Sequence, residues 1–358
     1  MILCEQDGPD MSMSPGFPML YVMGFAFAIS LAFSGFMIHV GIGDVPEGRS
    51  NHTRTTPTAG GVGIVAGLGG LFLILPQFFT SSWALPEWPM ILSVLWAVGL
   101  LGLMDDAFGI PTGLQFMLFI FLGALAFRII VPVAGLPYAA SHVGLPYWAG
   151  FAGSLLWIFA VTNVVNFMDG SNGLMAVVMG TAFLALAAIA TFMGAFHAVL
   201  IPAAMAAGLI GFLPYNFRNK ALIFSGDTGA LVTGFGFAIA VLWLCRERTL
   251  DMPVFIGPVL LLPFLTDSLL TLLRRAMNKE NLFEPHKKHV YQRLIAAGYS
   301  HVAVALCYGA ATLAVAIYAF YAVKYGFHRY TAFLLFPVML FSVIYYALVS
   351  WLKKKAVS

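Results

Sequence analysis

The sequence predicts an all-α, polytopic membrane helix bundle, and three observations lead to this fold class. Hydrophobic residues make up 61% of the 358 residues and charged residues only 9%, whereas a soluble domain carries about 25% charged residues. The apolar residues gather in stretches of the length, about 20 residues, that a helix needs to cross a bilayer. The alternating pattern of a membrane β-barrel is absent.

The same composition excludes several other classes of protein. A chain this apolar is not disordered, and three scattered cysteines do not form a disulfide scaffold. The net charge of +3 is too small for the basic face that binds nucleic acid.

Eleven apolar stretches are candidates for transmembrane helices, and we expect about 10–11 of them to cross the membrane. In chain order they cover residues 17–40, 60–79, 88–104, 114–135, 147–166, 173–193, 195–213, 228–245, 253–273, 300–322 and 331–352. The third stretch is short, and only Gly194-Ala195 separates the sixth from the seventh.

The domain organisation follows from these stretches. Residues 1–16 hold three acids and no base, so they form an N-terminal extension rather than a signal peptide. Residues 17–352 form a single integral membrane domain, and residues 353–358 form a basic cytosolic tail.

The distribution of lysine and arginine over the loops predicts the orientation. One set of loops, with the C-terminal tail, holds thirteen of these bases, and the opposite set holds four. Since cytoplasmic loops carry the excess of positive charge, the N-terminus is expected outside and the C-terminus inside.

Five polar connections lie on the predicted cytosolic face. They read RSNHTRTTPTAGG (49–61), LMDDAFGI (103–110), NVVNFMDGSNGL (163–174), PYNFRNKALIFSGDTGA (214–230) and NLFEPHKKHVYQRL (281–294). Carboxylates suit Mg²⁺ that is shared with substrate phosphates, and bases suit the phosphate oxygens themselves. The combination indicates phosphoryl transfer at the membrane boundary, with an amphiphilic second substrate.

The two aspartate motifs each allow a simpler interpretation. Asp105-Asp106 ends a helix and could be a solvated boundary, although adjacent carboxylates repel each other and a cation relieves the repulsion. Asn163, Asn166 and Asp169 recur every three residues, which places them on one helical face. The alternative is an ordinary turn in which Asn and Asp tolerate left-handed backbone.

The motifs of the last two loops also allow more than one interpretation. Asp227 in SGDTG can be a helix cap only, and Asn216 adds little by itself. His286 and His289 lack the further ligands of a zinc site. They either bind an anion such as a diphosphate, or belong to a basic segment that touches lipid headgroups.

Taken together, the ordered motifs resemble a known family. TPTAGG, DDAFG, NVVNFMDGSNGL, an isolated Asn216, GDTGA and HKKHVYQ have its order and spacing from about residue 40 to about residue 300. The chain resembles the polyprenyl-phosphate N-acetylhexosamine-1-phosphate transferases, the MraY/WecA superfamily. The resemblance implies transfer of a sugar-1-phosphate from a UDP-N-acetylhexosamine to polyprenyl (undecaprenyl) phosphate, with release of UMP.

The resemblance also implies the setting of the reaction. It points to the bacterial inner membrane, a cytosolic catalytic face, Mg²⁺ with Mn²⁺ as a substitute, a homodimer, and a product that starts a cell-surface polysaccharide. Asp105 would activate the lipid phosphate with support from Asp106, and Asp227 would bind the metal with Asp169 as a second ligand. The residues expected to bind substrate are Thr56, Thr58, Asn163, Asn166, Asp169, Asn172, Asn216, His286 and His289.

Several positions depart from the family pattern. Gly109 stands where the pentapeptide branch has lysine, and Lys287 with Lys288 separates two histidines that are adjacent there. Asn172 replaces a more usual aspartate, and Thr53 replaces a lysine before TPT. The HxxHxYQ form resembles the O-antigen-initiating branch, so a simple N-acetylhexosamine is expected and a phospho-N-acetylmuramoyl-pentapeptide transferase is the alternative.

A secondary transporter is the alternative from another class. Asp267, Thr271 and Arg274 follow i, i+4, i+7 in an apolar stretch, and Asp267 could instead neutralise Arg128. Transporters place coupling acids near mid-membrane within repeats, whereas here the acids crowd one boundary and no repeat is evident. The aspartate and arginine run of alcohol phosphatidyltransferases is absent as well.

Overall fold

The computed structural model describes residues 16–40, 43–44, 56–78, 87–127, 130, 133–138, 141–248, 253–282, 284 and 286–355. The predicted extension therefore lies outside the described residues except for Gly16, and so do Arg128 and the last three residues of the predicted tail.

Within these ranges the chain forms thirteen α-helices. They are α1 (Gly16–Val40), α2 (Gly61–Phe78), α3 (Trp88–Phe108), α4 (Thr112–Ala126), α5 (Tyr147–Met168), α6 (Leu174–Phe192), α7 (Leu200–Asn216), α8 (Gly226–Glu247), α9 (Ile256–Leu260), α10 (Leu262–Met277), α11 (Val290–Ala296), α12 (His301–Lys324) and α13 (Ala332–Lys355). Short 3₁₀ turns η1 (His197–Val199), η2 (Pro253–Phe255) and η3 (Phe327–Arg329) precede α7, α9 and α13.

Two small antiparallel ladders accompany the helices, and the sequence did not predict either. Strand β1 (Gly43–Asp44) pairs with β2 (Thr56–Pro57), and β3 (Gly135–Tyr138) pairs with β4 (Ser141–Gly144) in a hairpin between α4 and α5.

Each of the eleven predicted stretches contains a helix, which confirms the all-α membrane bundle. Among the described residues, eight helices are long and apolar enough to cross a membrane, or nine if α9 and α10 count as one bent span. That span bends by 72°, and Pro263 lies just after the break, where it has no N–H with which to continue the hydrogen bonds of α9 into α10. The described apolar parts of α2 and α4 are shorter than a full span, so the predicted 10–11 spans exceed this count.

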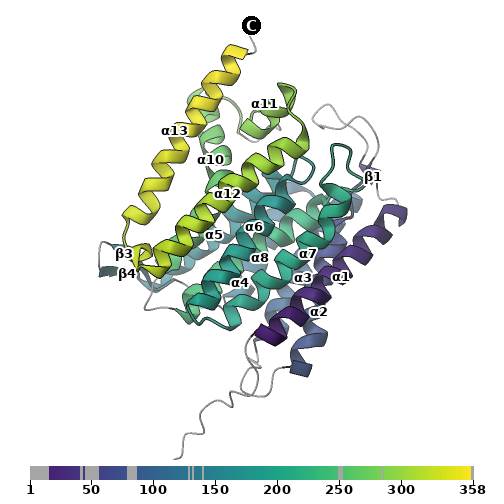
Figure 1. Cartoon of the computed structure of the whole chain (residues 1–358), viewed down its shortest axis with the longest axis vertical. Helices are drawn as coiled ribbons and strands as arrows, with labels where there is room; N and C mark the ends of the chain where they lie inside the picture. The colour runs from purple at the N-terminus through teal and green to yellow at the C-terminus, as the bar shows by residue number, and fades with distance from the viewer. Residues whose placement is uncertain are drawn as a thin grey trace, which may run out of the picture.

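Helix α8 forms the centre of the bundle. Its membrane-spanning segment is buried throughout, and it packs against α3 and α5. Figure 1 shows α1 and α13 at opposite edges of the bundle, with α6, α7 and α8 between them. The N-terminus of α8 therefore lies near the middle of one end of the bundle.

The bundle has an upper and a lower end in the view of Figure 1. The upper end carries β1, α10, α11 and the C-terminus, whereas α1 starts at the lower end, and the β3–β4 hairpin lies at the left edge of the view near the lower ends of α12 and α13. The two ends of the described chain thus lie at opposite ends of the bundle, while the side of the membrane that each faces stays a prediction.

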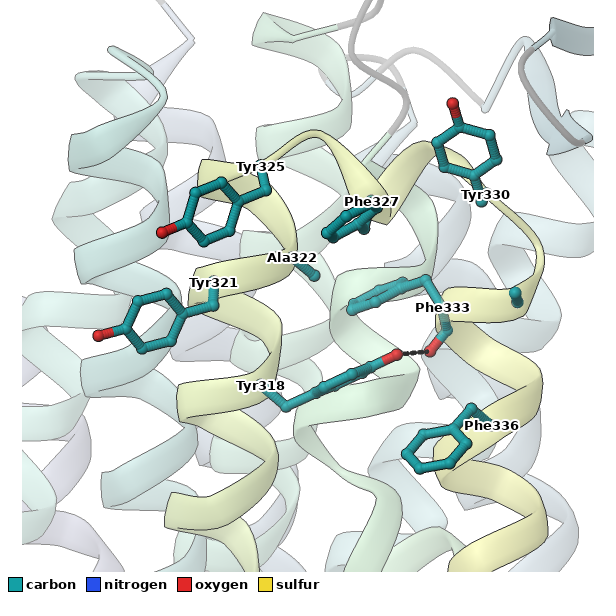
Figure 2. Close-up of a pocket in the computed structure, with 9 residues that line it drawn as sticks. Tyr318, Tyr321, Ala322, Tyr325, Phe327, Tyr330, Phe333 and Phe336 are labelled. Atoms are coloured by element: carbon teal, nitrogen blue, oxygen red, sulfur yellow. Dashed lines mark hydrogen bonds between the residues drawn. The ribbon is translucent and has the colours of Figure 1, made fainter.

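Aromatic side chains line a hollow at the lower end, between α12 and α13 (Figure 2). The hollow has a volume of about 700 Å³. The Tyr318 hydroxyl donates a hydrogen bond of 3.1 Å to the Phe333 carbonyl oxygen, and the Lys324 ammonium lies 5.8 Å from the ring centre of Tyr321. Such aromatic rings with a nearby cation are typical of the boundary between lipid and water.

Candidate active site

A carboxylate from α3 holds the first turn of α8. The two oxygens of Asp106 accept hydrogen bonds from the backbone N–H of Asp227 (2.8 Å), the backbone N–H of Thr228 (3.1 Å) and the Thr228 hydroxyl (2.7 Å). The first N–H groups of a helix have no partner within that helix, and its positive end favours a negative charge. Asp106 therefore sets the position of Asp227 and has its own oxygens occupied.

Glycines allow α3 and α8 to approach this closely. A Cβ atom added to Gly102 of α3 would lie 2.6 Å from the backbone carbonyl carbon of Asp227. Gly226, the first residue of α8, has a φ of 66°, and a Cβ there would collide with the Asp106 carboxylate. The motif needs glycine before Asp227 because only glycine adopts this backbone conformation at low cost.

Asp105, the neighbour of Asp106, faces the carboxyl group of Asp227. The turn after α3 orients Asp105, since its oxygens accept hydrogen bonds from the Ile110 N–H (2.6 Å) and the Gln115 amide (3.1 Å). The Asp227 carboxyl lies within hydrogen-bonding reach of the side chains of Asp105 and Asn166. Acids from the end of α3 and the start of α8 thus meet at one point.

The end of α5 adds a third acid. Asp169 accepts a hydrogen bond from the Ser225 hydroxyl, directly before α8. Burial and the charge of Asp106 raise the pKa of Asp169 to about 8, although the Ser225 hydrogen bond lowers it. The predicted row of Asn163, Asn166 and Asp169 along α5 does not act as one group. The Asn163 amide donates a hydrogen bond of 2.8 Å to the Phe159 carbonyl of its own helix.

This group of acids suits a hard divalent cation. Among the described residues, no ion pair joins Asp105, Asp106, Asp169 or Asp227 to a base, and no three His, Cys, Asp or Glu side chains form a ready metal cage. Mg²⁺ keeps several waters and takes only one or two protein carboxylates besides substrate phosphates. Oxygen donors from Asp227 and its neighbours fit that requirement.

The TPTAGG segment reaches the site through its backbone. The Phe224 N–H donates to the Pro57 carbonyl (2.7 Å), and the Gly60 and Gly61 N–H groups donate to the carbonyls of Phe224 and Ser225 (2.9 Å each). This short pairing lays the first loop along the residues that lead into α8. Half-buried Thr56 and Thr58 flank Pro57. The Thr58 carbonyl oxygen lies close to the start of α8, since a Cβ atom added to Gly226 would be 2.5 Å from it.

Two predicted substrate-binding amides hold loops together. Asn216, 5% exposed, accepts from the Gly173 N–H (2.6 Å) and donates to the Ile223 carbonyl (2.9 Å). Asn172, 9% exposed, donates to the Arg218 carbonyl (2.9 Å). These bonds join the third and fourth loops, and they use polar atoms that a substrate contact would need.

The fifth loop lies beside the third. The Tyr291 hydroxyl donates 3.1 Å to the Phe167 carbonyl, two residues before Asp169, and so places α11 at the end of α5. His289 is buried and His286 is half-buried, with ring centres 4.8 Å apart. Burial, together with the nearby positive groups, lowers the pKa of His286 to about 4.

A charged cluster orders the loop between α10 and α11. Glu280 accepts from the Arg275 guanidinium (3.1 Å) and the Lys288 ammonium (2.6 Å). These two cations lower the pKa of Glu280 to about 2, so it stays ionised near neutral pH. The predicted basic segment thus has an acidic partner of its own.

The structure adds four polar residues to the predicted site. Gln115 orients Asp105, Ser225 bonds Asp169, Tyr291 places α11, and His301 lies 3.0 Å from the Ser171 hydroxyl. Ser225 and Tyr291 lie within the motifs already singled out, and Gln115 is an isolated polar residue in an apolar stretch. Nothing in the sequence indicated that His301 would reach the third loop.

A polytopic helix bundle with acids from three helix ends around one N-terminus defines the class, and comparison with known proteins identifies the family. The model of glycosyl transferase family 4 matches residues 88–245, from the start of α3 nearly to the end of α8. The chain belongs to this family, which confirms its resemblance to the MraY/WecA superfamily.

Curated relatives cover most of the chain. A Bacillus subtilis protein named "Probable undecaprenyl-phosphate N-acetylglucosaminyl 1-phosphate transferase" is 29% identical over 74% of this chain and 72% of its own length. The undecaprenyl-phosphate alpha-N-acetylglucosaminyl 1-phosphate transferase of Yersinia pestis is 25% identical over 79% and 77%. The phospho-N-acetylmuramoyl-pentapeptide-transferase of Bacillus cytotoxicus is 30% identical over 69% and 81%.

Proposed function

We propose that the chain transfers N-acetylhexosamine-1-phosphate from a UDP-sugar to polyprenyl phosphate at the upper end of the bundle. An oxygen of the lipid phosphate attacks the phosphorus that carries the sugar. The bond from this phosphorus to the oxygen of UMP breaks, and UMP leaves with the electron pair. The product is a polyprenyl-diphosphate-sugar, the starting lipid of a cell-surface polysaccharide.

The observation that carries this proposal is that, in a membrane bundle of this family, Asp105 faces Asp227 while Asp169 is bonded to Ser225, two residues before Asp227. An acid cluster at the boundary of the apolar helices lies within reach of both a water-soluble sugar nucleotide and the phosphate of a lipid. The names of the relatives above support the same pair of substrates.

Asp105 is the residue best placed to act on the lipid phosphate. Its carboxyl is only half-buried, and the hydrogen bonds from Ile110 and Gln115 fix its direction. A phosphate monoester loses its second proton near pH 6, so part of the substrate is protonated near neutrality. Asp105 takes that proton and leaves a dianionic oxygen for the attack.

Mg²⁺ would be held by Asp227, with Asp169 beside it, and Mn²⁺ could replace it. When bound, the ion neutralises charge on the transferred phosphate. Two like charges 4 Å apart repel by about 4 kcal/mol at an effective dielectric constant of 20. The chain itself contributes by holding Asp227 rigidly through Asp106 and by placing His286 and His289 beside the site for the diphosphate.

Purified protein in detergent tests the proposal directly. It is incubated with undecaprenyl phosphate, Mg²⁺ and a panel of UDP-N-acetylhexosamines; UMP release and the mass of the lipid product are measured. Activity should vanish on chelation, and Mg²⁺ with the UDP-sugar should raise the melting temperature of the wild type but not of Asp227→Ala. If no donor in the panel yields UMP and a heavier lipid, the proposal fails.

The same panel contains the donor of the second candidate function. A phospho-N-acetylmuramoyl-pentapeptide transferase among the relatives is 30% identical, so UDP-N-acetylmuramoyl-pentapeptide belongs in the assay. Gly109 and the separated histidines favour the simpler N-acetylhexosamine for this chain. A lipid product that carries the pentapeptide would reverse this choice.

The proposal places the protein in the bacterial inner membrane with the upper end in the cytosol. A cysteine introduced by Lys287→Cys at the upper end should react with an impermeant thiol reagent only after the membrane is opened. Arg329→Cys at the lower end should react in intact cells. Light scattering in detergent tests the expected homodimer.

A further inference from the structure

The acid that the sequence singled out inside a membrane helix has a complete set of partners without Arg128. Asp267 of α10 is 2% exposed. It accepts hydrogen bonds from the backbone N–H groups of Val290 (2.8 Å) and Tyr291 (3.2 Å) and from the Tyr308 hydroxyl (2.6 Å). Its two oxygens therefore accept the first backbone N–H groups of α11, the helix that follows the HKKH segment.

A charged group buried so deeply is expensive unless it is fully hydrogen-bonded. The two backbone bonds are the kind that an N-terminal cap supplies, but here the cap comes from another helix. The interaction adds to a local capping box, in which His289 is the N-cap residue of α11 and the Gln292 side chain accepts a hydrogen bond from the His289 N–H (3.3 Å). The predicted stripe along α10 is real, since Thr271 donates to Asp267 (3.3 Å) and Arg274 to the Lys288 carbonyl (3.1 Å).

The same carboxylate faces His289. Its Oδ1 lies 3.6 Å from Nδ1 of His289, and this nitrogen is buried with no hydrogen bond of its own in the described structure. A small approach would let Nδ1–H donate to Asp267. Because the two ring nitrogens point in different directions, an Nδ1 turned to Asp267 leaves Nε2 for a partner on another side.

The surroundings of His289 keep the ring in this pose. The ring stacks on Tyr291 with centres 5.9 Å apart, and His286 lies next to it. Tyr291 in turn is tied to the end of α5 near Asp169. A displacement of α11 would therefore move His289 relative to the acids of the site.

We propose that Asp267 is a positioning residue for the transfer reaction. From inside α10 it fixes the start of α11 and the Nδ1 side of His289, so that Nε2 is directed to a phosphate of the sugar nucleotide. The inference rests on the proposed function, and it gives the intramembrane acid a role that needs neither ion transport nor a pair with Arg128.

A double-mutant cycle distinguishes this role from general support of the bundle. Asp267→Asn should lower kcat/KM for the UDP-sugar by about 10–100-fold, the loss seen when a group that orients a metal-bound histidine is removed from an enzyme. The KM for the UDP-sugar should rise while the KM for the lipid phosphate changes little. In a His289→Gln background, the same Asp267→Asn change should cost less than about threefold, because its target is already gone.

Equal losses in both backgrounds would overturn the proposal, since a merely structural acid acts independently of His289. Ser268→Ala is the matched control, because Ser268 is the buried neighbour on α10 and its hydroxyl has no hydrogen-bond partner in the described structure. This variant should keep wild-type kinetics.

A second variant covers the case in which Asp267→Asn does not accumulate. Tyr291→Phe removes the bond to Phe167 at the other side of α11 and should show the same rise in KM and the same dependence on His289. Independence from His289 would again contradict the proposal.

Hydrogen exchange separates this inference from the proposed function. The Val290 and Tyr291 amides of the wild type should exchange slowly without any substrate, and Asp267→Asn or, failing that, Tyr291→Phe should speed them up. Unchanged exchange would overturn the anchoring role even in an active enzyme. If these variants exchange faster but the wild type itself releases no UMP with any donor, the anchoring role of Asp267 stands and the proposed function is rejected.

Discussion

Helices α3 and α8 lie side by side, and their two ends are joined in different ways. At the lower end, the Arg246 guanidinium of α8 pairs with Glu87, directly before α3, at 2.9 Å. At the upper end, Asp106 of α3 binds the backbone of α8 at 2.8 Å, and Asp105 faces Asp227 with no base between them among the described residues. One end matches acid with base, whereas the other brings acids together.

The contrast shows what each end does. An acid paired with a base needs nothing further, and the Arg246 guanidinium lowers the pKa of Glu87. Converging acids are unfavourable unless a cation or a bound proton balances them. The lower end therefore joins two helices, while the upper end gathers acids that, under the proposed function, a metal ion would balance during phosphoryl transfer.

The largest predicted effect is the loss of an acid from the upper end. Asp227→Ala and Asp105→Asn should each lower UMP release by at least about 100-fold, because each removes a group that acts on transferring phosphate. Their amounts in membranes should match the wild type. Wild-type-like UMP release by both variants would refute the assignment and leave the contrast between the ends without functional meaning.

Asp106→Asn should have the next largest effect, and it should differ in kind. The variant loses charge at the N-terminus of α8 and replaces one accepting oxygen by an NH2 group, so we expect a 10–100-fold loss of activity with a destabilisation of about 1–2 kcal/mol. Melting temperature and UMP release are measured together. Lost activity with an unchanged melting temperature would make Asp106 a substrate or metal contact rather than a support for Asp227.

Gln115→Leu should have a smaller effect. It removes the amide that orients Asp105, while Ile110 continues to donate to the other oxygen. One hydrogen bond of about 1 kcal/mol corresponds to roughly a fivefold loss of kcat with stability retained. Gln115→Lys keeps a donor and should recover most of the rate; equal rates for Gln115→Leu and the wild type would show that Asp105 is oriented by the turn alone.

Arg246→Gln at the lower end should have the smallest effect. The pair is partly exposed, so its loss should cost less than about 1 kcal/mol and leave UMP release unchanged. Since the fold lowers the pKa of Glu87, the contribution of the pair is present above the unfolded pKa and disappears as pH falls through the folded value. A large loss of activity would mean that the two ends are coupled and not distinct.

The sequence alone predicted the fold class and the position of most of the long helices. The bilayer demands long apolar segments, so every predicted stretch became a helix, including the short one at 88–104, which extends to Phe108. The sequence did not predict the break at Leu261 or the shortness of α4. The length of an apolar stretch does not show whether the helix bends or ends within it. The ladders β1–β2 and β3–β4 were missed because strands of two to four residues give no periodic signal.

The composition of the candidate site could also be predicted, but not the division of labour within it. Asp105 and Asp106 are adjacent and chemically identical, yet one faces Asp227 and the other caps α8. Asn172 and Asn216 have the same side chain as Asn166, yet they join loops while Asn166 reaches Asp227. Asp267 pairs with α11, whereas its suggested partner Arg128 lies outside the described residues.

The sequence by itself therefore determined the class of the protein, its helices and the chemical groups available at one end, because hydrophobicity and side-chain chemistry are properties of residues and their spacing. Only the tertiary structure decided which oxygen meets which N–H and which acids converge. Those contacts join residues far apart in the chain, such as Asp106 with Asp227 and Asp267 with Val290, and their geometry depends on how closely the helices pack.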